Sequence, residues 1–106
     1  MAVKEAVAYM NEHYNEELTL GFISSLVNMT PQHFCKIFKE STKVTYIDYL
    51  KKIRVEHAKE LLIQGKMTIS QISDRVGYRD PNYFGSLFKK TVGKSPSQFQ
   101  KEEGRS

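Results

Sequence analysis

Two stretches of this 106-residue chain repeat one another along most of their length. Residues 18–49 align with residues 67–99 at an offset of 49, which becomes 50 after one extra residue at Arg79. The matches fall on apolar, capping and turn positions: Thr19 with Thr68, Leu20 with Ile69, Ile23 with Ile72, Ser24 with Ser73, Val27 with Val76, Pro31 with Pro81, Phe34 with Phe84, Ile37 with Leu87, Phe38 with Phe88, Lys39 with Lys89 and Tyr49 with Phe99. Each copy predicts a short helix, a tight turn and a second helix that ends in lysines, which is the pattern of a helix-turn-helix. The repeat therefore predicts an all-α chain with two similar units.

Helix start and stop residues divide the chain into seven predicted helices, at 2–14, 20–27, 31–42, 45–64, 69–76, 81–92 and 96–101. Asn28 and Gly77 occupy the two tight turns, because both residue types tolerate the left-handed conformation. The residues suited to N-cap these helices are Thr19, Thr30, Thr45, Thr68, Asp80 and Ser95. We predict one domain, 1–106, with a first unit at 17–44, a connector helix at 45–64 and a second unit at 67–101.

Apolar spacing predicts which helical faces are buried. In the second helix of each copy the inward residues should be Phe34, Ile37, Phe38 and Ser41, and Phe84, Leu87 and Phe88. The inward stripe of the connector should be Ile47, Leu50, Ile53, Ala58, Leu61 and Leu62. The four repeated phenylalanines are therefore interpreted as core residues and not as platforms on which bases stack.

The charge of the chain is unevenly distributed. Sixteen Lys and Arg residues oppose 12 Asp and Glu residues, which gives a net charge of +4. Residues 1–30 hold one cation, Lys4, against four glutamates, so the positive charge belongs to the part that contains the repeated second helices. A polyanionic partner is one interpretation, and a solvated basic surface is the other.

Several classes of protein are disfavoured by the sequence. No run of about 18 apolar residues is present, so no membrane span is expected. The first residues lack the layout of a signal peptide, and a cytoplasmic location is the expectation. Cys35 is the single cysteine, and its spacing from His13, His33 and His57 does not match a zinc site. We expect no metal, no cofactor and no enzymatic activity.

The predicted arrangement suits double-stranded DNA. A helix-turn-helix places its second helix in the major groove, where residues near the start of that helix meet base edges. The 20-residue connector would span about 30 Å at about 1.5 Å per residue. That length approaches the groove repeat of about 34 Å per turn. We therefore predict that the two second helices enter successive major grooves, so that a single chain recognises an asymmetric site.

The sequence resembles the DNA-binding domain of AraC/XylS-type transcriptional regulators over residues 3–101. The motifs that carry the resemblance are Leu18-Thr-Leu, Pro31-Gln-His-Phe-Cys-Lys-Ile-Phe-Lys-Glu, Tyr49-Leu with Arg54, Ala58-Lys-Glu-Leu-Leu62, Ile72-Ser, Val76-Gly-Tyr, Asp80, Tyr83-Phe84, Phe88-Lys-Lys, Gly93 and Ser95-Pro-Ser. The resemblance implies seven helices, two helix-turn-helix units and sequence-specific binding to promoters. It also implies a separate sensor, receiver or ligand-binding domain in most full-length members, and RNA polymerase is a further candidate partner. The chain looks like the C-terminal part of such a regulator or a short stand-alone member.

Family base contacts fall on outward positions early in each second helix. In the first unit these positions are Gln32, His33, Cys35 and Lys36. Glutamine can make paired hydrogen bonds to adenine, lysine can reach guanine acceptors, and a small thiol can touch a thymine methyl. Each residue also has a structural interpretation: Lys36 as a surface cation, His33 as a locally packed side chain and Cys35 as a tolerated surface thiol.

The second unit departs from the family pattern. Its outward positions are Pro81, Asn82, Gly85 and Ser86, and the last two side chains have little reach. We predict one base contact there, Asn82, and a unit that mainly binds phosphates. The expected backbone contacts of the two units together are Thr30, Lys39, Arg79, Ser86, Lys89 and Lys90.

Three alternatives remain open at the level of the sequence. Arg54, beside the apolar stripe of the connector, is interpreted as part of an internal ion pair and not as a DNA contact. The whole chain could instead be a protein-interaction module with degenerate helix-turn-helix units, which Gly85 and Ser86 favour. A DNA-repair protein with a methyl-accepting cysteine would need an activated thiol, and Cys35 has no such neighbours in the sequence.

Overall fold

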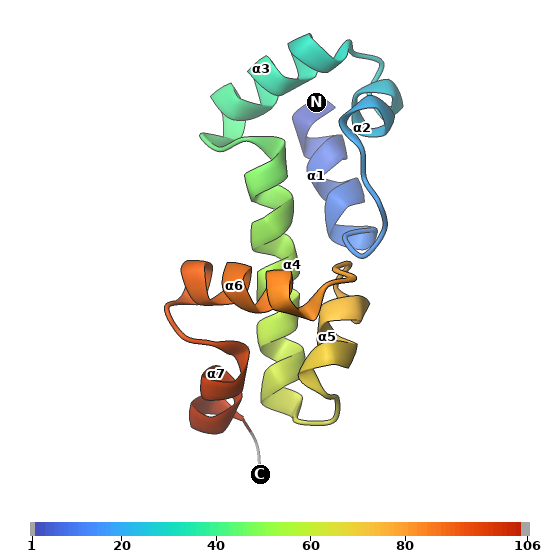
Figure 1. Cartoon of the computed structure of the whole chain (residues 1–106). Coiled ribbons are helices and arrows are strands. Elements are labelled where there is room, and N and C mark those ends of the chain that lie inside the picture. The colour runs from blue at the N-terminus through green and yellow to red at the C-terminus, as the bar shows by residue number, and fades with distance from the viewer. Residues whose placement is uncertain (1, 105–106) are drawn as a thin grey trace. The chain divides into compact units, whose positions relative to one another are not determined.

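The computed structural model describes residues 2–104, and these residues form seven α-helices (Figure 1). In chain order they are α1 (Ala2–Glu12), α2 (Leu20–Leu26), α3 (Pro31–Thr42), α4 (Tyr46–Gln64), α5 (Ile69–Arg75), α6 (Pro81–Val92) and α7 (Pro96–Glu103). The prediction of an all-α chain with two helix-turn-helix units and a long connector is confirmed. The chain divides into two compact parts inside α4, which we call unit 1 (residues 1–53) and unit 2 (residues 54–106).

The short helix of each unit begins at the threonine that the sequence predicts. The Thr19 hydroxyl oxygen accepts a hydrogen bond from the Phe22 backbone N–H at 3.2 Å, and the Thr68 hydroxyl oxygen accepts one from Gln71 at 3.1 Å. The Gln71 side chain also accepts from the Thr68 backbone N–H at 2.9 Å. Unit 2 therefore has a complete capping box, which satisfies two helix-end donors where unit 1 satisfies one.

The turns that follow the short helices are left-handed, as predicted. Asn28 has φ 60° and Gly77 has φ 106°. An asparagine adopts the first value at modest cost, whereas the second lies outside the usual left-handed basin and suits glycine alone. Gly77 also leaves room for a neighbour, because an added Cβ would lie 3.1 Å from the Arg54 guanidinium. That guanidinium lies 5.0 Å from the centre of the Tyr78 ring.

The helices α3 and α6 start alike in the two units. The Thr30 hydroxyl oxygen accepts from the His33 N–H at 3.2 Å, and an Asp80 carboxylate oxygen accepts from the Asn82 N–H at 2.9 Å. A proline occupies the first turn of both helices, where its missing N–H removes no helical hydrogen bond. These caps fix the beginning of the two helices whose outward faces carry the predicted DNA contacts.

Four phenylalanines form equivalent cores in the two units, as predicted. The rings of Phe34 and Phe38 lie 5.5 Å apart in unit 1, and the rings of Phe84 and Phe88 lie 5.8 Å apart in unit 2. All four side chains are fully buried. An edge-on aromatic ring closes each core. The ring centroids of Tyr49 and Phe38 lie 5.4 Å apart, and those of Phe99 and Phe88 lie 5.5 Å apart. Burial of one such side chain stabilises a fold by about 1.5–3 kcal/mol.

The helix α4 belongs to both units. Its first half buries Tyr46, Leu50 and Ile53 and closes unit 1, as α7 closes unit 2. Its second half opens unit 2, as α1 opens unit 1. The buried residues of these two opening helices match at an offset of 52: Val3 with Val55, Ala6 with Ala58 and Met10 with Leu62. The structural repeat therefore begins earlier than the sequence alignment at residue 18 indicates.

This double role explains an error in the predicted stripe of the connector. Ile47 was expected to face inward, but 53% of its surface is exposed, while Tyr46 and Val55 are buried. One continuous stripe was the wrong expectation, because the buried face of α4 changes at the boundary between the units. Leu61, also expected inside, is half-buried.

Two smaller expectations are also wrong. Ser41 is exposed, and Thr42 is the half-buried residue. The Thr42 hydroxyl donates to the Phe38 carbonyl at 2.8 Å, which satisfies this polar group at the end of α3. The first helix ends at Glu12 and not at Tyr14, because residues after Glu12 form a turn in which the Glu16 N–H donates to the His13 carbonyl.

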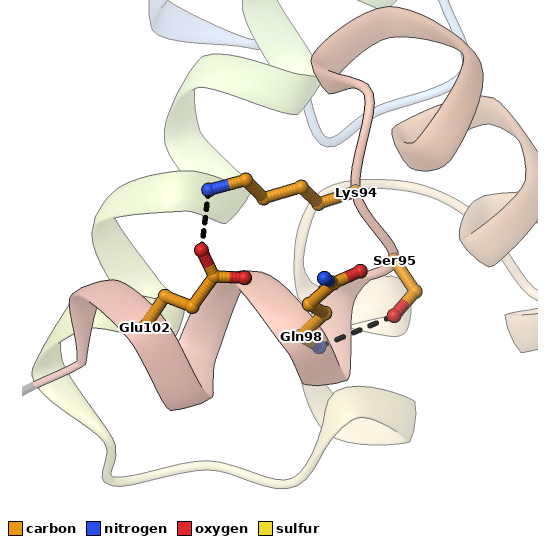
Figure 2. Close-up of polar contacts among 4 residues, drawn as sticks. All are labelled: Lys94, Ser95, Gln98 and Glu102. Atoms are coloured by element: carbon orange, nitrogen blue, oxygen red, sulfur yellow. Dashed lines mark hydrogen bonds and ion pairs between the residues drawn. The ribbon is translucent and has the colours of Figure 1, made fainter.

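Polar contacts fix the last helix of unit 2 (Figure 2). The Ser95 hydroxyl oxygen accepts from the Gln98 N–H at 3.1 Å and caps α7. The Lys94 ammonium lies 2.6 Å from a Glu102 carboxylate oxygen, and this hydrogen bond and charge raise the pKa of Lys94 above its ordinary value. At the equivalent place in unit 1, Thr45 caps α4 through the Asp48 N–H at 3.1 Å, and the sequence has Val44 in place of Lys94.

Candidate nucleic-acid interface

The outward face of α3 carries all the base contacts predicted for unit 1. Gln32, His33, Cys35 and Lys36 are exposed. They occupy positions beside and between the buried residues Phe34 and Phe38, and residues three and four apart share one side of a helix. The four side chains therefore form one surface next to the helix start, as binding in a major groove requires.

Thr30 lies at the start of this surface and is exposed. Its oxygen is occupied by the hydrogen bond from the His33 N–H, but the hydroxyl proton can still be donated to a phosphate. The positive end of the helix dipole lies at the same place and favours a negative group. The predicted phosphate contact is therefore compatible with the capping role of Thr30.

Cys35 is a free thiol on the exposed side of α3. Burial raises the pKa of Tyr46, and a smaller contribution comes from the negative charge of an ionised Cys35. The Tyr46 hydroxyl donates to the Leu18 carbonyl at 3.4 Å. Cys35 follows Phe34, whose ring centroid lies 6.0 Å from that of Tyr46, so this part of α3 packs near the start of α4.

The equivalent surface of α6 is flatter. Asn82 and Ser86 are exposed, and Gly85 stands where unit 1 has Cys35. A Cβ added at Gly85 would meet no atom within 4 Å, and this glycine lies inside a regular helix. Neither packing nor backbone conformation requires a glycine there. The fold would accept a side chain at this position, so the absence of one affects only the outward surface of α6.

Tyr83 is an exposed residue of this surface for which the sequence alone indicated no role. It stands where unit 1 has His33, and 46% of its surface is exposed. Its ring lies 5.6 Å from the ring of Tyr78, which holds it at the start of α6. The repeat alignment pairs Tyr83 with a predicted base contact, and that pairing was the signal that could have identified it.

Five cations accompany the two outward faces: Lys36, Lys39, Arg79, Lys89 and Lys90. All five are exposed, and within residues 2–104 none of them forms an ion pair. Lys89 and Lys90 lie in the last turn of α6, where positive charge also favours the helix end. Their charges are thus available to a polyanion.

Two further features bear on other kinds of site. Among the described residues, no three His, Cys, Asp or Glu side chains are grouped so that they could hold a metal ion. None of the helices formed by residues 2–104 combines the length and the apolar character that crossing a membrane requires.

Comparisons with known proteins place this geometry in a family. The profile of the helix-turn-helix domain family matches residues 23–102. The C-terminal domain of AraT, a response regulator from Geobacillus stearothermophilus, superimposes with a TM-score of 0.94 at 34% identity, over 99% of this chain and 88% of that one. The chain belongs to the AraC-type helix-turn-helix family. The resemblance noted from the sequence is confirmed.

Curated relatives of this AraC-type domain are named as transcription regulators. The lactose operon transcription activator of Staphylococcus xylosus is 36% identical over 98 residues, which cover 92% of this chain and 35% of the relative. The bifunctional transcriptional activator and DNA repair enzyme AdaA of Bacillus subtilis strain 168 is 34% identical over 92 residues, which cover 87% of this chain and 44% of the relative. The chain thus spans less than half the length of these relatives.

Proposed function

We propose that this AraC-type domain regulates transcription by binding promoter DNA in a sequence-specific manner. The observation that carries the proposal is the repeated outward face: two helix-turn-helix units are built alike, and each presents the start of its second helix with cations that have no partner among residues 2–104. Phosphate neutralisation by such cations supplies much of the affinity for DNA.

Unit 1 is the unit that recognises bases. Gln32 is suited to adenine and Lys36 to guanine, because their side chains are long enough to reach base edges from the helix start. His33 and Cys35 complete the predicted base contacts. Thr30 and Lys39 bind phosphates on either side of them.

Unit 2 mainly binds the DNA backbone. Gly85 has no side chain, and Ser86 has a short one that suits a phosphate. Arg79, Lys89 and Lys90 supply positive charge to the same unit. Asn82 remains the predicted base contact. Tyr83, whose side chain is exposed, is the next residue in the sequence.

The two second helices enter successive major grooves. The support is the continuity of α4, whose 19 residues correspond to about 28 Å at about 1.5 Å per residue. The groove repeat is about 34 Å. With this arrangement one copy of the domain recognises an asymmetric site without a two-fold partner.

The full-length protein joins this domain to a sensor or receiver domain and acts in the cytoplasm. The support is the length of the relatives, of which the chain covers less than half, and the response-regulator context of AraT. A contact with RNA polymerase stays a prediction.

The salt dependence of DNA binding tests the proposal. Fluorescence anisotropy with a labelled 40-base-pair duplex of mixed sequence measures affinity between 50 and 200 mM salt. With about six to ten phosphate contacts, affinity should fall by about 10³–10⁵ over this range. The Arg79→Ala/Lys90→Ala variant should show a shallower salt slope. No binding at 50 mM salt, or an affinity that does not change between 50 and 200 mM salt, would contradict the proposal and favour a protein-interaction module.

A further inference from the structure

An apolar patch lies on the solvent side of α2. Phe22 is 45% exposed and Leu26 is 44% exposed, and the two residues are one helical turn apart. The Tyr9 ring of α1 lies 5.6 Å from the Phe22 ring and extends the patch. We call Tyr9, Phe22 and Leu26 the α2 patch. Adjacent large apolar side chains on a surface mark sites of interaction more often than scattered single ones do.

The repeat shows that folding does not require this patch. The alignment pairs Phe22 with Gln71 and Leu26 with Arg75. The helix α5 nevertheless begins with the same threonine cap and buries the same inward residues, Ile72 and Ser73, that Ile23 and Ser24 supply in α2. Polar side chains therefore suffice at both positions, and the apolar pair of unit 1 has a reason other than the stability of α2.

Acidic residues precede α2 in the sequence, and one of them, Glu16, reaches the α2 patch through His13. The His13 ring stacks on Tyr9 at 4.1 Å, and its Nδ1 lies 2.5 Å from a Glu16 carboxylate oxygen. Glu12, Glu16 and Glu17 are all exposed. Glu12 is the last residue of α1, where a negative charge opposes the helix dipole. Helix stability thus does not explain the acids.

The acidic segment is also an addition to the repeat. Residues 13–18 connect α1 to the cap of α2, whereas residues 65–67 make the equivalent connection between α4 and the cap of α5. Glu16 and Glu17 lie within the longer connection. Unit 1 therefore has an apolar pair where unit 2 has Gln71 and Arg75, and two glutamates in a connection whose counterpart, residues 65–67, has no acidic residue.

The chemistry of the patch specifies its occupant. DNA is disfavoured, because residues 1–30 hold four glutamates and one lysine. Two apolar side chains one turn apart on a helix match the spacing of anchors on a facing amphipathic helix. We propose that the α2 patch docks a basic amphipathic helix of a partner protein, with apolar anchors on Phe22 and Leu26 and Lys or Arg side chains toward Glu12, Glu16 and Glu17.

Selection from a phage-displayed library of random 16-residue peptides tests this proposal with the 106-residue chain at 50 mM salt. Enriched peptides should have apolar residues three or four positions apart and an excess of Lys and Arg. The Phe22→Gln/Leu26→Arg variant carries the residues of unit 2. Its affinity for an enriched peptide should be at least about tenfold lower, as expected when central anchors are removed. Circular dichroism checks that the variant keeps its helices.

Two matched variants separate the parts of the proposal. Val44→Lys/Ile47→Ser replaces the other exposed apolar pair by its counterparts in unit 2 and should leave peptide affinity unchanged. Glu16→Gln/Glu17→Gln should weaken binding at 50 mM salt and much less at 500 mM salt. Absence of enriched peptides, enrichment of acidic ones, or equal binding by the Phe22→Gln/Leu26→Arg variant would overturn the proposal. So would a concentration-dependent dimer abolished by the same variant, because a second copy would then be the occupant.

Discussion

Unit 1 and unit 2 bury equivalent residues at equivalent places. Phe34 and Phe38 with Tyr49 in one unit correspond to Phe84 and Phe88 with Phe99 in the other. Both opening helices bury three residues at matching positions, although one of them is an independent helix and the other is half of α4. The contacts within each unit thus restrict which side chains can occupy these positions.

The surfaces of the two units differ in a consistent way. Where unit 1 exposes apolar side chains, unit 2 has polar ones: Phe22 with Gln71, Leu26 with Arg75, Val44 with Lys94 and Ile47 with Ser97. On the outward face of the second helix unit 2 has the shorter side chains, because Lys36 corresponds to Ser86 and Cys35 to Gly85. The two units share one core pattern, and we propose that these surface differences reflect separate tasks: base recognition and partner docking for unit 1, and backbone binding for unit 2.

The largest expected effect tests the equivalence of the two cores. Phe38→Ala and Phe88→Ala should each reduce the free energy of unfolding by about 3–5 kcal/mol, because each leaves a cavity among fully buried aromatic rings. Urea unfolding followed by circular dichroism measures the loss. A loss below about 1 kcal/mol in either variant would show that its core relaxes around the cavity, and the equivalence would fail.

A reciprocal exchange tests the difference between the turns. Gly77→Asn should cost about 1–3 kcal/mol, because a side chain at φ 106° is strained and lies against the Arg54 guanidinium. Asn28→Gly should change stability by no more than about 0.5 kcal/mol, since φ 60° suits both residues. Urea unfolding of both variants checks this asymmetry, and equal effects would contradict it.

Two lysines test the division between base recognition and backbone binding. Lys36→Ala should cost about 1–3 kcal/mol on a preferred duplex and relax the preference at one position. Lys90→Ala should weaken binding to all duplexes alike and reduce the salt slope by about one. Anisotropy with the preferred duplex and with single-base variants distinguishes the two. If both substitutions lowered affinity without any change in base preference, the division would be wrong.

The helix caps should show the smallest contrast. Thr68→Ala should cost about 1–2 kcal/mol and Thr19→Ala about 1 kcal/mol, because unit 2 has a full capping box. Thermal unfolding measures both. A larger loss for Thr19→Ala would mean that the extra hydrogen bond from the Thr68 N–H to Gln71 adds nothing to the stability of α5.

Local rules predicted most of the fold. The caps at Thr19, Thr30 and Thr68 and the turns at Asn28 and Gly77 depend on neighbouring residues, and the structure confirms them. The error at Ile47 has a different origin. The buried face of α4 depends on which unit each half packs against, and that choice is made by residues far away in the sequence.

The correspondence of α1 with the second half of α4 was missed for a related reason. The matching pairs are Val3 with Val55, Ala6 with Ala58 and Met10 with Leu62, so two pairs are identical and the third exchanges one apolar residue for another. Their offset is 52. The acidic connection after α1 is longer than its counterpart in unit 2, so the offset changes from 52 before it to 49 after it. Burial, and not similarity of the surrounding sequence, makes the match visible.

Exposure of the candidate contacts was predictable from helical spacing. Gln32, Lys36 and Asn82 lie on the sides of α3 and α6 opposite the buried phenylalanines, as a period of 3.6 residues requires. Which of these side chains meets a base depends on the angle at which each helix enters the groove. That angle is set by the protein and DNA surfaces together, so it is not encoded in the spacing of one helix.

Selection of duplexes from a random-sequence library with the 106-residue chain tests the central claim most directly. We predict an asymmetric motif with one strongly specified patch for unit 1 and a weakly specified half one helical turn away for unit 2. The patch should lose definition in Lys36→Ala and keep it in Lys90→Ala. Two equally specified patches would contradict the division of tasks, and no enrichment at all would contradict sequence-specific DNA binding.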